Sequence, residues 1–166
     1  MAAFNLQQFY HFCKQLKIET KEQGLRKMDN LLGTQKYVMS EIAKGLEEDV
    51  HFFTILKGRQ LGITTISLAL DLYWHFINPG LQGTLTTDTE ENRDMFRSTL
   101  AMYMEGLPKE YKIPVIAHNR TQMSLKKPVL MKNGQTLLVC QDTFVATRLI
   151  NGKILREHIR HSNFNC

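Results

Sequence analysis

Apolar residues recur with helical spacing through the N-terminal part of the chain. A first set comprises Phe4, Leu6, Phe9, Phe12, Cys13 and Leu16. This spacing predicts an amphipathic helix over Phe4–Ile18. The polar stretch ETKEQGLRKMDNLLG follows it, and we expect that stretch to be helical in part. The first third of the chain therefore reads as mainly helical.

A second helical pattern lies just before the middle of the chain. Its apolar positions are Tyr37, Val38, Ile42 and Leu46. Thr34 can cap a helix that carries them on one side and ends near Glu47–Asp49. We take residues 1–49 as an N-terminal helical segment.

The next part of the chain alternates β-prone runs with a helical pattern. Val50–Leu56 and Gly83–Thr87 are short runs rich in β-forming residues, so each predicts a strand. Between them, Thr64–Phe76 is strongly apolar and stops before Asn78 and Pro79, which predicts a helix. The pattern is that of a strand–helix–strand unit.

A further helix should follow the second strand, with Thr87 or Asp88 as its cap. Glu90 and Glu91 fall in its first turn, where acidic side chains complement the helix dipole and need no catalytic role to explain them. Its inner face is expected to carry Met95, Phe96, Leu100 and Met104.

From Ile113 onward the pattern changes to the alternation that is typical of strands. The pairs Asn133–Gly134 and Asn151–Gly152 are strong hairpin signals, which makes the last third mainly β. The fold class predicted from these patterns is α/β, in which a strand–helix unit leads into antiparallel strands.

Composition narrows the class of protein. With 43% hydrophobic and 22% charged residues, 166 residues suit one globular domain. No apolar run of about 18 residues and no signal peptide is evident, so we expect a cytoplasmic protein without a membrane partner. A net charge of +5 is compatible with a polyanionic partner such as DNA, and equally with an ordinary soluble surface.

The cysteine and histidine residues do not predict a metal centre. Cys13, Cys140 and Cys166 are odd in number and far apart, which argues against a disulfide framework and against a zinc site. His158 and His161 could share a helical face near Cys166, but a zinc site would need further ligands at fixed positions.

The segment KGRQLGITT, residues 57–65, joins the first predicted strand to its helix. A phosphate-binding loop needs inward backbone N–H groups, a glycine at a tight bend, a hydroxyl for Mg²⁺ and a cation, usually spaced as GxxxxGK[ST]. Gly62 and Thr64 fit this pattern, whereas Ile63 stands at the lysine position. Lys57 or Arg59 could supply the missing cation. The alternative is a basic turn without a ligand.

FTILKGRQLGITT resembles the variant Walker A segment of bacteriophage large terminase subunits, the ATP-driven motors that package DNA into procapsids. GTQKYVMSEI is similar to the glutamine-bearing segment that precedes this loop in the family. GTLTTDTEENRDMFR and HNRTQMSLKKPVLMKNGQTLLV resemble later parts of the same domain. The resemblance covers roughly residues 30–140.

The resemblance implies a P-loop NTPase-like sheet with flanking helices, an N-terminal helical segment and a C-terminal third rich in β-hairpins. It implies ATP and Mg²⁺ as cofactors, with Gln35 on adenine, Thr64 on Mg²⁺ and Arg59 stabilising charge during phosphoryl transfer. The nucleotide-binding residues that it implies are Gln35, Lys57, Gly58, Arg59, Gln60, Leu61, Gly62, Ile63, Thr64 and Thr65. Its partners would be double-stranded DNA, a small terminase subunit and the procapsid portal.

An acidic partner for the loop is hard to find in the sequence. Asp142, after the apolar run Leu137–Cys140, is a candidate metal ligand, with an ordinary loop aspartate as the alternative. Residues 143–166 depart from the family pattern, which a truncated, frameshifted or degenerate gene would explain. We therefore divide the chain into 1–49, a partial ATPase core over 50–142, and a divergent tail over 143–166.

Three functions remain open at this point. The first is an ATP-binding fragment of a large terminase. The second is a non-enzymatic basic module for DNA binding or assembly, in which the loop has lost its nucleotide. The third, a helicase-like ATPase, is disfavoured because no helicase acidic motif follows the loop.

Overall fold

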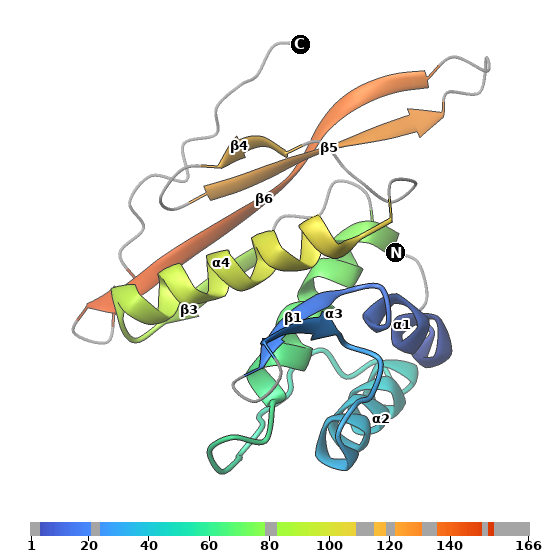
Figure 1. Cartoon of the computed structure of the whole chain (residues 1–166), viewed down its shortest axis with the longest axis vertical. Coiled ribbons are helices and arrows are strands. Elements are labelled where there is room, and N and C mark those ends of the chain that lie inside the picture. The colour runs from blue at the N-terminus through green and yellow to red at the C-terminus, as the bar shows by residue number, and fades with distance from the viewer. Residues whose placement is uncertain are drawn as a thin grey trace.

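The computed structural model describes residues 4–20, 24–78 and 83–108, and beyond them the backbone of four strands. Figure 1 shows a helical part that contains α1 (Leu6–Cys13), α2 (Gly33–Glu47) and α3 (Ile63–Ile77). A sheet lies on the other side of the long helix α4 (Glu90–Gly106), which contacts both α3 and strands of the sheet. The molecule is therefore of mixed α/β class.

The first helix forms as predicted but is shorter. Asn5 caps α1 by accepting a hydrogen bond from the Gln8 N–H at 3.0 Å, and the helix ends at Cys13. The thiol of Cys13 is buried and unbridged, and burial raises its pKa to about 12. The expected helix through Ile18 is wrong in its last turn, because the chain enters a strand there.

An antiparallel hairpin, not a helix, occupies the polar stretch after α1. Strand β1 (Lys17–Thr20) pairs with β2 (Gly24–Lys27), with Lys17 opposite Lys27. The Met28 N–H donates to the Leu16 carbonyl at 2.9 Å, which extends the pairing, and both side chains are buried. Burial of these two apolar side chains favours the hairpin over the helix that the polar composition suggested.

Helix α2 begins just before the predicted cap and buries Ile42 as predicted, with Val38 and Leu46 packed partly against the core. Its N-cap is Leu32, and its buried side chains are Gln35, Met39 and Ile42. Tyr37, expected on the inner face, is 66% exposed, so this part of the prediction is wrong. The helix ends at Glu47, close to the acidic cluster that was expected to mark its end.

The expected strand over Val50–Leu56 does not form. This segment has no helical or strand hydrogen bonding, and Phe52 and Leu56 are 95% and 101% exposed. Among the described residues no strand pairs with it. Since β-propensity reflects packing against neighbouring strands, a β-prone run that lacks such a neighbour stays irregular.

The next three elements match the predictions closely. Helix α3 extends the expected helix by one residue at each end, and β3 (Gly83–Thr87) has the predicted bounds. Helix α4 carries Glu90 and Glu91 in its first turn, as expected. Its cap is Thr89, whose hydroxyl accepts from the Asn92 N–H at 3.2 Å, so neither Thr87 nor Asp88 is the cap.

The core lies where α1, α3 and α4 meet. Its fully enclosed side chains include Phe9, Cys13, Leu16, Met39, Ile66, Leu72, His75, Leu100 and Tyr103. Leu100 and Met104 are buried as predicted, and Phe96 packs partly against the core, whereas Met95 is 51% exposed, contrary to the prediction. A cluster of rings, among them Phe9, Phe12 and Tyr73, joins α1 to α3.

The sheet has the strand order β3-β6-β5-β4, with β4 (Val115–His118), β5 (Gln122–Leu130) and β6 (Thr136–Ile150). Strand β3 is parallel to β6, whereas β5 is antiparallel to both β6 and β4. The short strand β7 (Lys153–Ile154) pairs with β6. Both Asn-Gly pairs lie outside the described residues, as do His158, His161 and Cys166.

Asp142 belongs to the long strand β6 and is not a loop residue. It falls where the pairing register shifts between Ser124 and Leu125 of β5. Strand β6 also runs without interruption across residues 142 and 143, where the sequence suggested a boundary. The sheet therefore includes part of the segment that was expected to diverge.

Candidate functional site: the loop before helix α3

The connection from α2 to α3 is exposed and projects from the helical part of the molecule, as Figure 1 shows. Lys57, Gly58, Arg59 and Gln60 are all exposed, and Leu61 and Gly62 are half-buried. Neither Lys57 nor Arg59 forms an ion pair with any residue that the structure describes. The loop thus presents two positive charges to solvent immediately before a helix N-terminus.

Gly62 must be glycine for two separate reasons. Its φ of 65° lies in the left-handed region, which side chains with a Cβ disfavour. A Cβ at this position would also lie 2.6 Å from Nε2 of Gln35. Gln60 shares the left-handed conformation with φ of 63°. The loop therefore turns sharply twice just before α3.

The first turn of α2 holds the end of this loop. The Gln35 Nε2 donates to the Gly62 carbonyl at 2.8 Å, and its Oε1 accepts from the Leu32 N–H at 2.9 Å. The neighbouring Thr34 hydroxyl donates to the Leu61 carbonyl at 3.4 Å. Gln35 itself is buried, with 6% of its surface exposed. Two consecutive loop carbonyls are thereby drawn towards α2.

The direction of these carbonyls fixes the direction of the N–H groups. A trans peptide group is planar, with its N–H opposite its C=O. Because the carbonyls of Leu61 and Gly62 face α2, the N–H groups of Gly62 and Ile63 point away from it. Those two groups are among the four that lack an intrahelical partner at the start of any helix. The N–H groups of Gly62 and Ile63 therefore face away from α2, where they could donate to a bound anion.

The burial of position 63 explains why the loop has isoleucine there and not lysine. Ile63 is 5% exposed, so a lysine amine there would lose its hydration. Thr64 and Thr65, the next two residues, are partly exposed. The hydroxyl expected on Mg²⁺, that of Thr64, thus lies on the first turn of α3.

Helix α3 is held from the opposite side by α4. The buried Tyr103 hydroxyl donates to the Thr65 carbonyl at 3.0 Å, and burial raises the pKa of Tyr103 above its usual value. The sequence did not predict the contact between Tyr103 and Thr65. It predicted Thr34 as a helix cap, not as a donor to the Leu61 carbonyl. The signal available for Thr34 was its position beside Gln35.

A partly buried carboxyl group lies further along α3. The side chain of Asp71 is 25% exposed, and one of its oxygens makes no hydrogen bond within the described part of the chain. Burial raises the pKa of Asp71 to about 6. His75 Nδ1 donates to the Asp71 backbone carbonyl at 2.8 Å, and burial lowers the pKa of His75. This pair belongs to the core and lies two turns or more from the loop.

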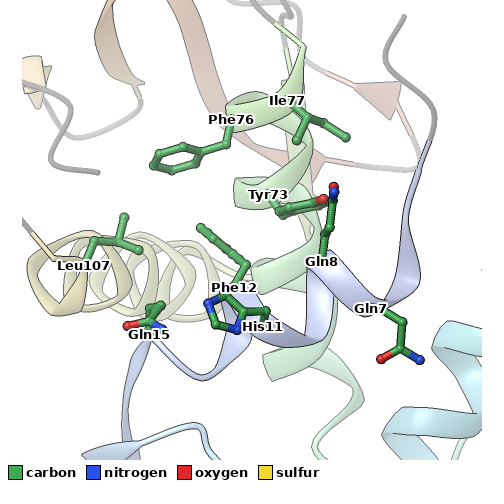
Figure 2. A pocket seen from close by; sticks show the side chains of 9 residues that line it. All are labelled: Gln7, Gln8, His11, Phe12, Gln15, Tyr73, Phe76, Ile77 and Leu107. Atoms are coloured by element: carbon green, nitrogen blue, oxygen red, sulfur yellow. The ribbon is translucent and has the colours of Figure 1, made fainter. Parts of the chain in front are cut away.

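Among the described residues, a cavity lies away from the loop. It has a volume of about 530 Å³ and lies between α1, the C-terminal end of α3 and the residue after α4 (Figure 2). Phe12, Tyr73, Phe76, Ile77 and Leu107 line it, with glutamine and histidine side chains of α1. No permanently charged side chain lines it, so it does not suit a triphosphate.

The described residues do not bring together acidic ligands for a metal ion. Within them there is no cluster of three or more His, Cys, Asp or Glu side chains that could hold a metal ion. The backbone of Asp142 is described but its side chain is not, so its relation to Arg59 is not defined. Of the helices described, none combines the length and apolar character needed to cross a membrane.

The chain shows a likeness to a solved structure. No protein-family model matches the chain, and no curated protein matches it either. The fold is similar to a solved large terminase ATPase domain of Thermus phage P74-26, with a TM-score of 0.46 and 18% sequence identity. The likeness covers 55% of this chain and spans 37% of the terminase chain.

Proposed function

We propose that this chain binds Mg²⁺-ATP at residues 57–65 and is the ATP-binding part of a bacteriophage large terminase subunit. The observation that carries the proposal is the exposed, basic loop that turns at the left-handed Gly62 directly into the N-terminus of α3. The resemblance of KGRQLGITT to the variant Walker A segment of these motors adds the identity of the ligand.

The chemistry of the loop fits a triphosphate. The free N–H groups at the start of α3 favour an anion, and the helix dipole acts in the same direction. Lys57 and Arg59 would supply the positive charge that the buried Ile63 cannot. Arginine adds a planar fork that suits phosphate oxygens.

The loop offers fewer groups to Mg²⁺ than to the phosphates. Thr64 offers one partly exposed hydroxyl, and Mg²⁺ bound to phosphates keeps several water ligands in any case. When bound, the ion would neutralise charge on the phosphate oxygens. Asp142 stays a proposed second ligand, and Arg59 a proposed stabiliser of charge during phosphoryl transfer.

In this proposal the complete motor couples ATP hydrolysis to the movement of double-stranded DNA into a procapsid. A small terminase subunit and the portal would be its further partners. The chain contains no recognisable pair of acidic residues at the end of a strand after the loop, so we expect binding of ATP with little hydrolysis by this chain alone.

Titration with fluorescent mant-ATP in the presence of Mg²⁺ tests the proposal. Replacing Lys57 by alanine removes a charged contact to phosphate and should weaken binding by about 10- to 100-fold. The matched control is Lys27→Ala, which removes an exposed lysine of β2 and should leave binding unchanged. Equal affinity of wild type and Lys57→Ala would count against the proposed site.

A second function rests on the net charge of +5. A basic module without nucleotide would bind DNA through phosphate contacts, with an affinity that falls steeply with salt. Its DNA binding would be indifferent to ATP and Mg²⁺. Fluorescence anisotropy with labelled DNA at two salt concentrations, with and without Mg²⁺-ATP, separates this function from the first.

A further inference from the structure

Both polar atoms of the Gln35 carboxamide are already engaged within the protein. Its Nε2 donates to the Gly62 carbonyl at 2.8 Å and its Oε1 accepts from the Leu32 N–H at 2.9 Å. Reading adenine through paired hydrogen bonds would need the same two atoms. With 6% of the residue exposed, a base has almost no access to them.

Capping of α2 explains only half of this arrangement. The bond from the Leu32 N–H to Oε1 is one half of a capping box, in which the third residue of a helix reaches back to the N-cap; leucine has no side-chain acceptor for the other half. The bond from Nε2 crosses 27 residues of sequence to the loop. Thr34 makes a parallel bond to the adjacent Leu61 carbonyl. Two neighbouring side chains of one turn thus hold two neighbouring peptide groups of the loop.

These bonds act on the groups that would face phosphate. The Gly62 carbonyl accepts from Gln35 Nε2 and from the Ile66 N–H at 3.1 Å. Both bonds fix the plane of the peptide group whose N–H belongs to Ile63, and hydrogen bonding to its carbonyl makes that N–H a stronger donor. The effect of Gln35 on a ligand would therefore pass through the loop backbone.

We infer that Gln35 is a positioning residue for the phosphate loop and not a reader of adenine. This inference rests on the proposed function. It assigns recognition to the triphosphate, through the loop N–H groups together with Lys57 and Arg59. The base is then left to contacts that do not involve Gln35.

Isothermal titration calorimetry of the full chain with Mg²⁺-ATP, Mg²⁺-GTP and magnesium tripolyphosphate tests the inference. Gln35→Leu should weaken all three by a common factor of about 3 to 10, equivalent to one hydrogen bond. Gln7→Leu, at an exposed glutamine of α1, is the matched control and should change none of them.

Two further measurements separate positioning from a loss of stability. All titrations are made well below the Tm of each variant, so a purely structural role of Gln35 would leave the affinities unchanged. Thr34→Val should weaken the three ligands in parallel, by a smaller factor, because its bond to the loop is longer.

The inference is overturned if Gln35→Leu weakens ATP alone, which is the result expected of an adenine reader. It is equally overturned if Gln35→Leu leaves all three affinities unchanged. Failure of wild type to bind any of the three ligands would instead reject the proposed function, and the inference with it.

Discussion

Replacing Gly62 by alanine should destabilise the protein by about 2–3 kcal/mol. The left-handed conformation at φ 65° costs an L-residue with a Cβ about 1–2 kcal/mol. The new Cβ would also lie 2.6 Å from Gln35 Nε2, which would force the carboxamide to move. Losing its bond to the Gly62 carbonyl adds about 1 kcal/mol.

Urea unfolding followed by circular dichroism measures this loss, and thermal unfolding should show a Tm lower by about 5–10 °C for a chain of this size. Gly58→Ala is a matched control in the same loop. A Cβ at Gly58 meets no atom within 4 Å and its φ is not left-handed. We expect this variant to lie within about 0.5 kcal/mol of wild type.

A double variant separates the two parts of the cost. In a Gln35→Ala background the overlap with the carboxamide disappears, so Gly62→Ala should then cost only the conformational part, about 1–2 kcal/mol. If Gly62→Ala cost no more than Gly58→Ala, the left-handed turn would be refuted. If the two changes added without coupling, the close approach of Gln35 to the loop would be refuted.

Three further changes test helix α3, its contact with α4 and the segment between α2 and α3. Burial raises the Asp71 pKa from 3.8 to about 6, so the folded state holds its proton longer than the unfolded state, and stability should fall as pH rises from about 4 to 6. Asp71→Asn should remove this pH dependence and raise the free energy of unfolding at pH 7 by about 3 kcal/mol, measured by urea unfolding. If the stabilisation by Asp71→Asn did not grow between pH 4 and pH 6, the raised pKa of Asp71 would be contradicted. Tyr103→Phe removes the donor to the Thr65 carbonyl and should cost about 1 kcal/mol, measured in the same way; no loss would mean that this bond does not hold α3. Phe52→Lys should leave Tm unchanged, since Phe52 is 95% exposed; a clear fall in Tm in thermal unfolding would show that Phe52 is packed.

Helices and strands whose signals are local were predicted well. Helix α3 has an almost continuous apolar run that stops before Asn78, and β3 has its predicted bounds. Helix α4 was found from its acidic first turn and inner apolar residues, although Thr89 proved to be the cap. In these elements the residues nearby in sequence determine the structure.

Elements that depend on distant partners were predicted poorly. The hairpin of β1 and β2 is mainly polar, and it is favoured by the packing of Leu16, Ile18 and Met28 at the core. The run Val50–Leu56 has the composition of a strand, but no described strand lies beside it. Neither fact can be read from the spacing of residues along one segment.

In the candidate site too, local features were predicted and contacts between distant residues were not. The motif located the loop, the glycine and the helix that follows it. The contacts from Thr34 and Gln35 to the loop span 27 residues, and the resemblance alone placed Gln35 on a base. The buried position of Ile63, which explains the missing lysine, also depends on the packing of α3.

In the proposed function, the loop N–H groups at the start of α3 hold a triphosphate. Titration of ¹⁵N-labelled protein with Mg²⁺-ATP, followed by amide chemical shifts, tests it most directly. The largest shifts, which should saturate, are expected at the amides of Gly58, Gly62, Ile63 and Thr64. Shifts confined to the cavity near Phe12 and Phe76, or no saturable shifts at all, would contradict it.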